Sequence, residues 1–557
     1  MLRTPAAFAL LFALALTAQA QPKAETVTSK GGVVVCVSPP AADVGLKVLK
    51  DGGNAVDAAV ATAFAMAVTW PEAGNIGGGG FMMVAAPGKE PTCIEYRETA
   101  PAAAKVDLFA DGKVTSLSHK AAGVPGTVRG LALAHKTFGK LEWTALVTPA
   151  AELAEKGFTI NAALVTGLNS VLGNPLTTNA EFKRVYGKPG GQKWKAGDTL
   201  VLKDLARTLR VVAEKGADAF YAGELAELLE KEMKAEGGLI TRADLAAYKA
   251  NERKPIRTTF RGFDVYGPPP PSSGGVALAE MLNILKTFDL KKHSRFSPEN
   301  THLMIEAMRR AYADRARHLG DPDFTKIPAE LTTKEYAKKL AAAIDPKRAT
   351  PSADLAPEIP LDKPSDSTTH FSVIDRDGLA VSNTYTLENS YGNRVVVRGA
   401  GYILNNEMTD FNPRPGLTNT KGQIGTAPNR VAPGKRMLSS MTPVIVLKDG
   451  RPVLITGSPG GRTIINTVLC VVLNVLEYGM TVDEAVSAPR LHHQWFPDVA
   501  KFEGLKTYPE LVDKLKPLGH TVTEARQGDA HSIAIDPDTG LRRGAADKRL
   551  DGKAAGE

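Results

Sequence analysis

The stretch PSDSTTHFSVIDRDG, residues 364–378, joins a polar, proline-containing run to a segment with the composition of a β-strand. The polar run ends at Ser367, and Thr368 follows it directly. Two interpretations are open at this junction. It is either an ordinary passage from loop to strand, or a site where the chain is cut so that Thr368 becomes a new N-terminus.

The turn after this stretch predicts the partner of Thr368. Its loop, residues 376–378, ends in a glycine that can adopt the left-handed conformation, which is typical of a three-residue hairpin loop. In that hairpin Asp375 faces Leu379, and Thr368 lies opposite Thr386 of the segment NTYTL. Directly opposed residues share one face of a sheet, so two hydroxyl groups should meet there. A plain threonine packing pair is the alternative.

A free N-terminus would make Thr368 a nucleophile. A threonine hydroxyl needs a base, and an N-terminal threonine carries one, its α-amine, with a pKa of about 7.7–8.0. Residues 345–367 are rich in proline, aspartate, serine and alanine and show no periodicity, which predicts a mobile, exposed linker. Cleavage between Ser367 and Thr368 would therefore activate the hydroxyl, and the linker would let the new end leave the site.

A second element of an acyl-transfer site is predicted in the stretch GSPGGRTIINTVL. Gly460 and Gly461 stand between a predicted strand and a predicted helix, where backbone N–H groups and the helix dipole favour negative charge. Such groups suit the oxyanion of an acyl-transfer intermediate. A plain glycine-rich turn is the alternative interpretation.

The composition is that of an ordinary globular protein, with 557 residues of which 43% are hydrophobic and 23% charged. The net charge of +8 is spread along the chain without a dense basic run, so we expect no nucleic-acid partner. Residues 1–20 combine an early arginine, a short apolar core and a small-residue end, the pattern of a secretory signal peptide. We therefore expect an exported protein, periplasmic or secreted, with no membrane span.

The cysteines and histidines do not form a recognisable metal-binding pattern. Cys36, Cys93 and Cys470 occur in apolar contexts and are expected to be buried, inert thiols. On a strand the adjacent His492 and His493 would point to opposite faces, and the chain has no CxxC or HExxH motif. We therefore expect neither a metal nor another cofactor.

Apolar periodicity predicts mainly helices in the first two-thirds of the chain and mainly strands in the last third. Residues 41–70 have the pattern of two helices separated at 52–53, the second one buried. The glycines of 77–80 are interpreted as a close approach of backbones. Further helices are predicted at 126–138, 143–156, 204–215, 223–235, 300–318 and 333–344. Strands are predicted at 369–375, 379–387, 393–397, 401–405, 442–448 and 452–457.

The chain resembles the γ-glutamyltranspeptidases, which are N-terminal-nucleophile hydrolases. The matching stretches run almost from end to end, in the order GGNAVDAAVATAFAMAVTWPEAGNIGGGGFMMV, YRETAP, PPPPSSGG, DSTTHFSV, NTYTL, ILNNEMTDF, LSSMTP, GSPGG and APRLHHQW. The resemblance implies an α+β fold, a four-layer αββα sandwich with two central antiparallel sheets. It also implies self-cleavage after Ser367 into a large subunit, 21–367, and a small subunit, 368–557, that stay together as one intertwined domain.

The resemblance further implies an activity. Thr368 would take a γ-glutamyl group from glutathione or another γ-glutamyl amide. Water, or an amino acid or dipeptide amine, would then accept the group. Thr386 matches the threonine that hydrogen-bonds the nucleophile, and Gly460 and Gly461 match the oxyanion hole.

The same resemblance assigns the residues that bind the amino-acid head of the substrate. Arg97 of YRETAP, helped by Ser439 and Ser440 of LSSMTP, would bind the α-carboxylate, for which arginine offers a two-pronged donor. Glu407 and Asp410 of NNEMTDF would receive the α-ammonium from the opposite side of the pocket. A surface ion pair for the arginine and a solvated turn for the two acids are the alternatives.

Two departures from the family pattern leave the substrate preference open. Glu388 stands where many members have asparagine, and it is included among the substrate-binding candidates. The loop after NNEMTDF has Lys421 near the place where some members carry a lid tyrosine. A related acylase of the glutaryl-cephalosporin type is therefore an alternative, and an unprocessed exported binding protein is a further one.

Overall fold

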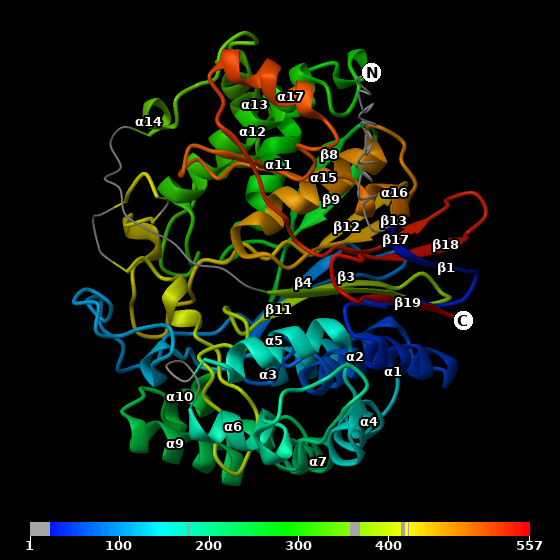
Figure 1. The fold of residues 1–557 in the computed structure, drawn as a ribbon. Helices are drawn as coiled ribbons and strands as arrows, with labels where there is room; N and C mark the ends of the chain where they lie inside the picture. Colours follow the sequence, from blue (N-terminus) through cyan, green and yellow to red (C-terminus); the bar gives the residue numbers. More distant parts are fainter. Residues whose placement is uncertain (1–22, 175–178, 357–367, 414–417, 422) are drawn as a thin grey trace, which may run out of the picture.

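The computed structural model describes residues 23–174, 179–356, 368–413, 418–421 and 423–557. Two sheets stack in the middle of the molecule, and helices cover the outer face of each (Figure 1). Neighbouring strands in both sheets run antiparallel. The α+β fold is thus the four-layer αββα sandwich with two central antiparallel sheets that the resemblance implies.

Each central sheet has seven strands. The first sheet has the order β1 (Glu25–Ser29), β18 (Arg542–Ala546), β17 (His531–Ile535), β13 (Arg451–Thr456), β12 (Val444–Lys448), β9 (Phe263–Gly267) and β8 (Ile256–Phe260). The second has the order β19 (Lys553–Gly556), β2 (Val33–Cys36), β10 (Thr369–Ile374), β11 (Ala380–Thr386), β3 (Gly79–Ala85), β4 (Thr92–Glu95) and β7 (Asn251–Arg253). Two small sheets are formed by β14 (Leu491–His492), β15 (Ala500–Phe502) and β16 (Val522–Glu524), and by β5 (Phe158–Thr159) and β6 (Thr199–Leu200).

The helices form the two outer layers (Figure 1). On the side of the second sheet lie α1 (Pro39–Lys50), α2 (Ala55–Thr69), α3 (Thr127–Phe138), α4 (Trp143–Lys156), α5 (Ala162–Leu172), α6 (Ala180–Tyr186), α7 (Lys203–Lys215), α8 (Asp218–Tyr221), α9 (Gly223–Glu236) and α10 (Arg242–Ala247). On the side of the first sheet lie α11 (Gly274–Leu285), α12 (Pro298–His318), α13 (Lys334–Ala342), α14 (Ser352–Leu355), α15 (Ile464–Leu476), α16 (Val482–Ser487) and α17 (Pro509–Leu515).

Strand alternation explains how the layers are held together. In β10, Val373 packs into the apolar core under the helices of the second sheet, and its neighbour on the other face reaches the first sheet. That neighbour, Ser372, donates a hydrogen bond to the carbonyl of His531 at 2.8 Å. Ser382 of β11 likewise donates to the carbonyl of Thr456 at 3.0 Å. Hydroxyl groups between the two sheets thus fix the position of one sheet on the other.

The predicted helices are confirmed, with ends within about two residues of those observed. The second helix of the 41–70 region, α2, is buried along its whole length. It begins at a capping box in which Asn54 and Asp57 each bond the other's backbone N–H.

The glycine-rich segment before β3 allows the close backbone approach that the sequence predicts. A Cβ on Gly78 would lie 2.0 Å from the carbonyl oxygen of Thr386, and one on Gly80 would lie 2.5 Å from that of Thr384. Both distances are far below a normal contact, so β3 can pair with the end of β11 only if these positions are glycine.

As predicted, helices predominate before Thr368, and the part after it is richer in strands. Both central sheets nevertheless also take strands from before Thr368: β1, β8 and β9 of the first sheet, and β2, β3, β4 and β7 of the second. Apart from β3 these strands are short, and some pair with the distant C-terminal end of the chain, so local patterns do not reveal them. The expected strands at 393–397 and 401–405 are wrong, since only one isolated bridge, between Val396 and Ile403, links them.

The first part of the expected linker, residues 345–356, is exposed at most positions, but it is not loose. Ser352 is fully buried, its N–H donates to Asp498 at 2.8 Å, and its hydroxyl donates to the carbonyl of Trp495 at 2.6 Å. The N–H of Ala349 donates to the carbonyl of Leu518 at 2.6 Å. Residues 345–356 are therefore anchored to the body by specific hydrogen bonds. The rest of the expected linker, 357–367 with Ser367, lies outside the described residues, as does the expected signal peptide, 1–20.

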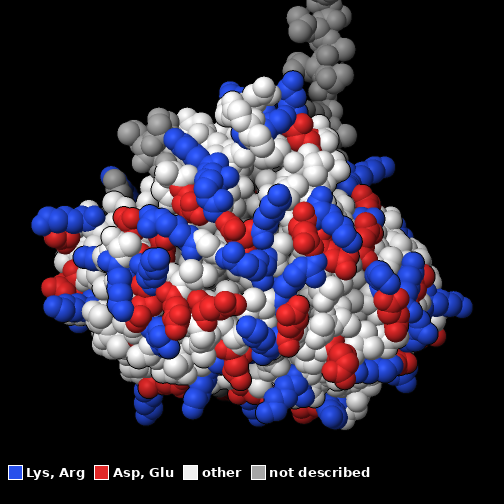
Figure 2. All heavy atoms as spheres, turned by 90° about the horizontal axis from the view of Figure 1, so that it is seen from below, with Lys and Arg blue, Asp and Glu red and all other residues white. Residues whose placement is uncertain are grey.

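The surface and the core agree with an ordinary globular composition. In the face seen in Figure 2, basic and acidic side chains are interspersed. Within the described ranges, none of the helices is both long enough and apolar enough to cross a bilayer. Cys36, Cys93 and Cys470 are buried free thiols, as predicted, and burial raises the pKa of Cys36 to about 12.

Candidate active site

Thr368 lies directly before β10 and is partly buried. Thr369 pairs with Tyr385, and the same register places Thr368 opposite Thr386, so the predicted pairing is confirmed. The hairpin loop has the expected form, since Gly378 has a φ of 88°. The two threonines thus meet at the end of the β10–β11 ladder.

Gly460 and Gly461 lie between β13 and α15, as predicted, and lead into a short 3₁₀ turn, Gly461–Thr463. Both have positive φ values, 125° and 53°, which glycine adopts most easily. Gly461 shares one pocket with Thr368, and Gly460 shares a second pocket with it. The glycine pair therefore lies beside the candidate nucleophile, at the N-terminal end of α15.

Arg97 follows β4 and is only 1% exposed. Its Nε donates to the carbonyl of Met437 at 3.2 Å, and its Nη2 donates to that of Leu438 at 3.3 Å. The same guanidinium pairs with the carboxylates of Glu407 and Asp410. Burial disfavours the charged guanidinium, but the two carboxylates outweigh it and raise the pKa of Arg97.

The prediction that Arg97 lies on one side of the pocket, with Glu407 and Asp410 on the opposite side, is wrong. The structure brings Arg97, Glu407 and Asp410 into direct contact. The physical reason is that a buried guanidinium is stable only with anionic partners, and these carboxylates are within reach. A carboxylate ligand for Arg97 must therefore replace a partner that it already has.

Three carboxyl groups share this one guanidinium and form what we call the site cluster: Arg97, Glu98, Glu407 and Asp410. Burial, which Arg97 only partly offsets, raises the pKa of Glu98 to about 8, and burial also raises that of Glu407 well above its ordinary value. Both oxygens of Glu98 and Oε2 of Glu407 lack a hydrogen-bond partner among the described residues. The cluster thus has more carboxyl groups than guanidinium groups, and it has spare acceptor atoms.

Ser439 and Ser440 lie on the pocket wall as expected, and they lead to a residue that sequence reasoning missed. Ser439 donates its N–H to the carbonyl of Pro271 at 2.9 Å, so the proline-rich segment fixes its position. Arg315 of α12 donates to Oγ of Ser440 at 2.9 Å and lines the same pocket. Its only sequence signal was an arginine-rich helical stretch, which looks like a solvated face.

Glu388 also belongs to the pocket. Its N–H donates to Oγ1 of Thr386 at 2.8 Å, and its Oε2 accepts from Asn406 at 2.8 Å. It has a φ of 77°, an unusual value outside glycine that is often found at functional sites. In the loop that follows the NNEMTDF segment, Ile424 lines the pocket, whereas Lys421 is exposed.

Two pockets therefore meet at Thr368. The first contains Arg97, Glu388, Glu407, Asp410, Ser439, Ser440, Thr386 and Gly461, and its cavity is only about 50 Å³ because these side chains fill it. The second contains Gly460 and has a cavity of about 340 Å³. The structure thus gathers every described candidate residue around one threonine.

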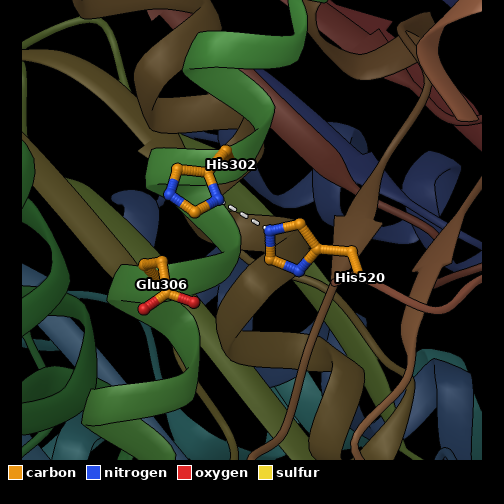
Figure 3. Close-up of side chains that lie close together, drawn as sticks. All are labelled: His302, Glu306 and His520. Atoms are coloured by element: carbon orange, nitrogen blue, oxygen red, sulfur yellow. Dashed lines mark hydrogen bonds between the residues drawn. The ribbon is translucent and has the colours of Figure 1, made fainter. Parts of the chain in front are cut away.

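One other group of described side chains has the donor types of a metal site: His302, Glu306 and His520, whose ligand atoms lie within 4.8 Å of one another (Figure 3). His302 Nδ1 lies 2.7 Å from His520 Nε2, a hydrogen-bond distance. Glu306 pairs with Arg309 and Arg310, so a dication would meet two positive charges there.

These contacts fit a structural role better. Glu306 also accepts hydrogen bonds from the N–H and hydroxyl of Thr350 at 3.1 and 2.6 Å. We call this group the anchor cluster: His302, Glu306, Arg309, Arg310, Thr350 and His520. It ties residues 345–356 to α12, and the expectation that the protein has no metal stays a prediction.

Comparisons with known proteins agree with this site. The model of the family described as gamma-glutamyltranspeptidase matches residues 41–557. The glutathione hydrolase proenzyme of Escherichia coli K12 is 46% identical over 532 residues, which cover 94% of this chain and 91% of that protein. The acylase ACY 1 proenzyme of Pseudomonas sp. SE83 is 36% identical, with 94% and 92% covered. The cephalosporin acylase from Bacillus halodurans shares the fold, with a TM-score of 0.86 at 26% identity over 99% of each chain.

The family match includes the hairpin with Thr368 and Thr386, the glycine pair and the acidic turn of the site cluster. The fold, these residues and the relatives therefore lead to one assignment. The chain is an enzyme of the N-terminal-nucleophile type and belongs to the γ-glutamyltranspeptidase family.

Proposed function

We propose that the protein is a γ-glutamyltransferase and glutathione hydrolase that activates itself by cleavage between Ser367 and Thr368. One observation carries this proposal: Thr368, opposite Thr386, shares a pocket with Arg97 and its two carboxylate partners. The name proenzyme, which the Escherichia coli relative carries, supports a precursor that is processed.

The cleavage step uses the Thr368 hydroxyl. Its oxygen attacks the carbonyl carbon of Ser367, the amide nitrogen of Thr368 leaves, and water hydrolyses the resulting ester. The products are a large subunit, 21–367, and a small subunit, 368–557, with a free α-amine on Thr368. Since each central sheet contains strands from both sides of Thr368, the two subunits would stay together.

The acyl-transfer step uses the same hydroxyl with the new amine as its base. The amine takes the hydroxyl proton, the oxygen attacks the γ-carbonyl carbon, and the N–H groups of Gly460 and Gly461 stabilise the oxyanion. The proton passes to the leaving amine, which departs and leaves a γ-glutamyl ester on Thr368. Water or an amino-acid or dipeptide amine then attacks the ester, and the hydroxyl of Thr386 holds the nucleophile in place.

Recognition of the amino-acid head proceeds by an exchange of partners. The α-carboxylate of the substrate replaces Glu407 and Asp410 as the partner of the Arg97 guanidinium, and the hydroxyls of Ser439 and Ser440 lie beside it. Glu407 and Asp410, released from Arg97, then receive the α-ammonium, and Glu388 adds a further carboxylate. Charge is conserved in this exchange, so no buried charge is left without a partner.

Mass spectrometry and one assay test the proposal together. The purified protein should contain two chains, the smaller beginning at Thr368, and should release p-nitroaniline from γ-glutamyl-p-nitroanilide. Thr368→Ala should remain uncut and inactive, and Thr368→Ser should keep part of both functions. An intact chain with full activity would refute the nucleophile assignment, and an intact, inactive wild type would favour a binding protein.

A related acylase remains the second candidate because the Pseudomonas relative is named as one. A glutaryl group lacks the α-ammonium, so it leaves the freed carboxylates without a cation. We therefore expect γ-glutamyl-p-nitroanilide to be cleaved much faster than glutaryl-p-nitroanilide. The reverse order would favour the acylase.

Export forms the last part of the proposal. Residues 1–20 would be removed as a signal peptide, and the enzyme would act in the periplasm or outside the cell. The N-terminus of the large subunit tests this, since it should be Gln21 when the protein is purified from the exported fraction.

A further inference from the structure

Arg315 is a buried arginine at the first pocket that takes no part in the proposed reaction steps. It comes from α12, is only 8% exposed and lines the pocket wall. Its Nε donates to Oγ of Ser273 at 2.9 Å, and its Nη2 donates to Oγ of Ser440 at 2.9 Å. Ser273 directly precedes α11 and Ser440 lies shortly before β12, so one guanidinium bonds two segments that are far apart in the sequence.

The segment before α11 fixes the backbone of the serine pair. Ser272 and Ser439 form an isolated parallel bridge. The N–H and the hydroxyl of Ser273 both donate to the carbonyl of Ser439, at 2.8 and 2.6 Å, and the hydroxyl of Ser272 donates to the carbonyl of Met441 at 2.5 Å. The backbone on both sides of Ser440 is therefore held in place, and only the direction of its hydroxyl proton is left to be set.

The direction of a serine hydroxyl proton depends on what its oxygen accepts, because the group has only one proton to donate. Oγ of Ser440 accepts from Arg315, and Oγ of Ser439 accepts from the N–H of Met441 at 3.1 Å. Neither hydroxyl donates to a residue in the part of the chain that the structure describes, and both serines line the first pocket. The protein thus presents both serines to the pocket as hydrogen-bond donors, which is the form that a carboxylate requires.

The charge of Arg315 makes this direction exclusive for Ser440. A guanidinium has no acceptor atom, so Ser440 cannot turn its proton toward Arg315. A hydrogen bond from a cation also polarises the hydroxyl, which makes its proton a better partner for an anion. A neutral amide or hydroxyl in place of Arg315 would allow both directions. The pocket therefore favours an anion beside Ser440 over a neutral hydrogen-bond donor.

We propose that Arg315 is a positioning residue that fixes the Ser440 hydroxyl as a donor to the α-carboxylate of the γ-glutamyl group. This inference rests on the proposed function and adds a specificity-determining residue to it. Arg315 acts through Ser440 and does not itself need to touch the substrate. This role differs from a direct ion pair between Arg315 and the carboxylate, and from a purely structural link between two segments.

A double-mutant cycle with Ser440 tests the proposal. Arg315→Met should lower kcat/KM for γ-glutamyl-p-nitroanilide roughly tenfold, the size expected when a hydrogen bond to a charged group is lost. Ser440→Ala should cause a loss of similar size. The double variant should lie within about twofold of Ser440→Ala, because Arg315 acts through that hydroxyl. Arg315→Lys, which keeps the charge and a donor, should recover part of the activity.

Two controls separate positioning from folding. Mass spectrometry shows whether each variant is still cut before Thr368, which requires a folded chain. Arg317→Met removes another arginine of α12, one that pairs with Asp314 at 2.9 Å and does not line the pocket, and it should leave kcat/KM unchanged. If Arg315→Met is not cut, Arg315→Gln takes its place in the cycle.

The cycle also defines the results that would overturn the inference. Losses that multiply in the double variant, to roughly hundredfold, would show that Arg315 acts independently of Ser440. A cut Arg315→Met enzyme with the kcat/KM of the wild type would overturn the inference as well, while the proposed function stands. A wild type that is cut but does not hydrolyse γ-glutamyl-p-nitroanilide would instead overturn the proposed function.

Discussion

The site cluster and the anchor cluster are both buried groups of arginines and carboxylates, but they are built in opposite ways. In the site cluster one guanidinium faces three carboxyls, and several oxygens lack hydrogen-bond partners among the described residues. In the anchor cluster one carboxylate faces two guanidiniums and also accepts from Thr350. Burial raises the pKa of Glu98 to about 8, whereas Arg309 and Arg310 overcome burial and lower that of Glu306.

The difference shows how a buried ion pair can serve binding or structure. A carboxylate whose oxygens already have all their ionic and hydrogen-bonding partners is not stabilised further by a new partner. It therefore holds two segments of the chain together. A cluster with excess carboxyls and spare acceptors can exchange partners with a zwitterion at little cost. The following changes test this contrast, in order of expected effect.

Arg97→Met should have the largest effect. It removes the only guanidinium of the site cluster, which is the group proposed to bind the α-carboxylate of the substrate. Loss of one partner of a buried charge pair costs about 2–5 kcal/mol, so kcat/KM for γ-glutamyl-p-nitroanilide should fall roughly thousandfold.

The controls for this change separate binding from folding. Cleavage before Thr368 does not need the amino-acid head, so the Arg97→Met chain should still be cut. Arg97→Lys, which keeps the charge but loses the two-pronged donor, should be intermediate. Activity of Arg97→Met within tenfold of the wild type would contradict the role of the site cluster.

Glu306→Gln should mainly change stability. It leaves Arg309 and Arg310 without their shared carboxylate, and breaking a buried ion pair costs about 3 kcal/mol or more. Urea unfolding in the uncut Thr368→Ala background measures this on a single chain. Glu299→Gln, an exposed change in the first turn of α12, is the matched control and should shift the midpoint little. Equal midpoints for the two variants would mean that the anchor cluster does not stabilise the fold.

The sequence predicted the parts of the site that depend on local geometry. The pairing of Thr368 with Thr386 follows from a three-residue loop, and the position of Gly460 and Gly461 follows from a strand–helix junction. The role of Arg315 could not be predicted, because it depends on how α12 packs against residues 439–440. The direct pairing of Arg97 with Glu407 spans 310 positions, and no local pattern reports it.

The same limit explains the errors in the fold. Strands β1 and β2 are short and pair with β18 and β19 near the other end of the chain, so periodicity alone does not reveal them. Residues 345–356 have the composition of a linker, and only their contacts with α12 and residues 495–498 show that they are anchored.

The pH dependence of stability should reveal the excess carboxyls of the site cluster. Burial raises the pKa of Glu98 to about 8 in the folded chain, whereas a glutamate in an unfolded chain has a pKa of about 4.3. The folded chain therefore binds this proton more tightly between those values, and its contribution to stability is lost as the pH rises through that window.

Glu98→Gln tests this directly, because a neutral side chain does not titrate. In the Thr368→Ala background, the stability of Glu98→Gln relative to its parent should increase by roughly 3 kcal/mol from pH 5 to pH 7.5. Denaturant midpoints at the two pH values measure the change. A constant difference between the two chains would show that Glu98 is not protonated in the folded state.

Ser352→Ala should have the smallest effect, since it removes only part of what holds residues 345–356. The Ser352 hydroxyl donates to the carbonyl of Trp495 at 2.6 Å and accepts from Nε of Arg309 at 3.2 Å. The variant loses these two bonds but keeps the backbone bonds to Asp498 and to the Trp495 indole.

We expect the free energy of unfolding of Ser352→Ala to fall by about 1 kcal/mol, with faster proteolysis confined to 345–356. Asp354→Ala, an exposed change in the same short helix α14, should leave proteolysis unchanged. If both variants were cut at the wild-type rate, residues 345–356 would be held by Glu306 and backbone hydrogen bonds alone. The contrast between the two clusters would then rest on the ion pairs of the anchor cluster.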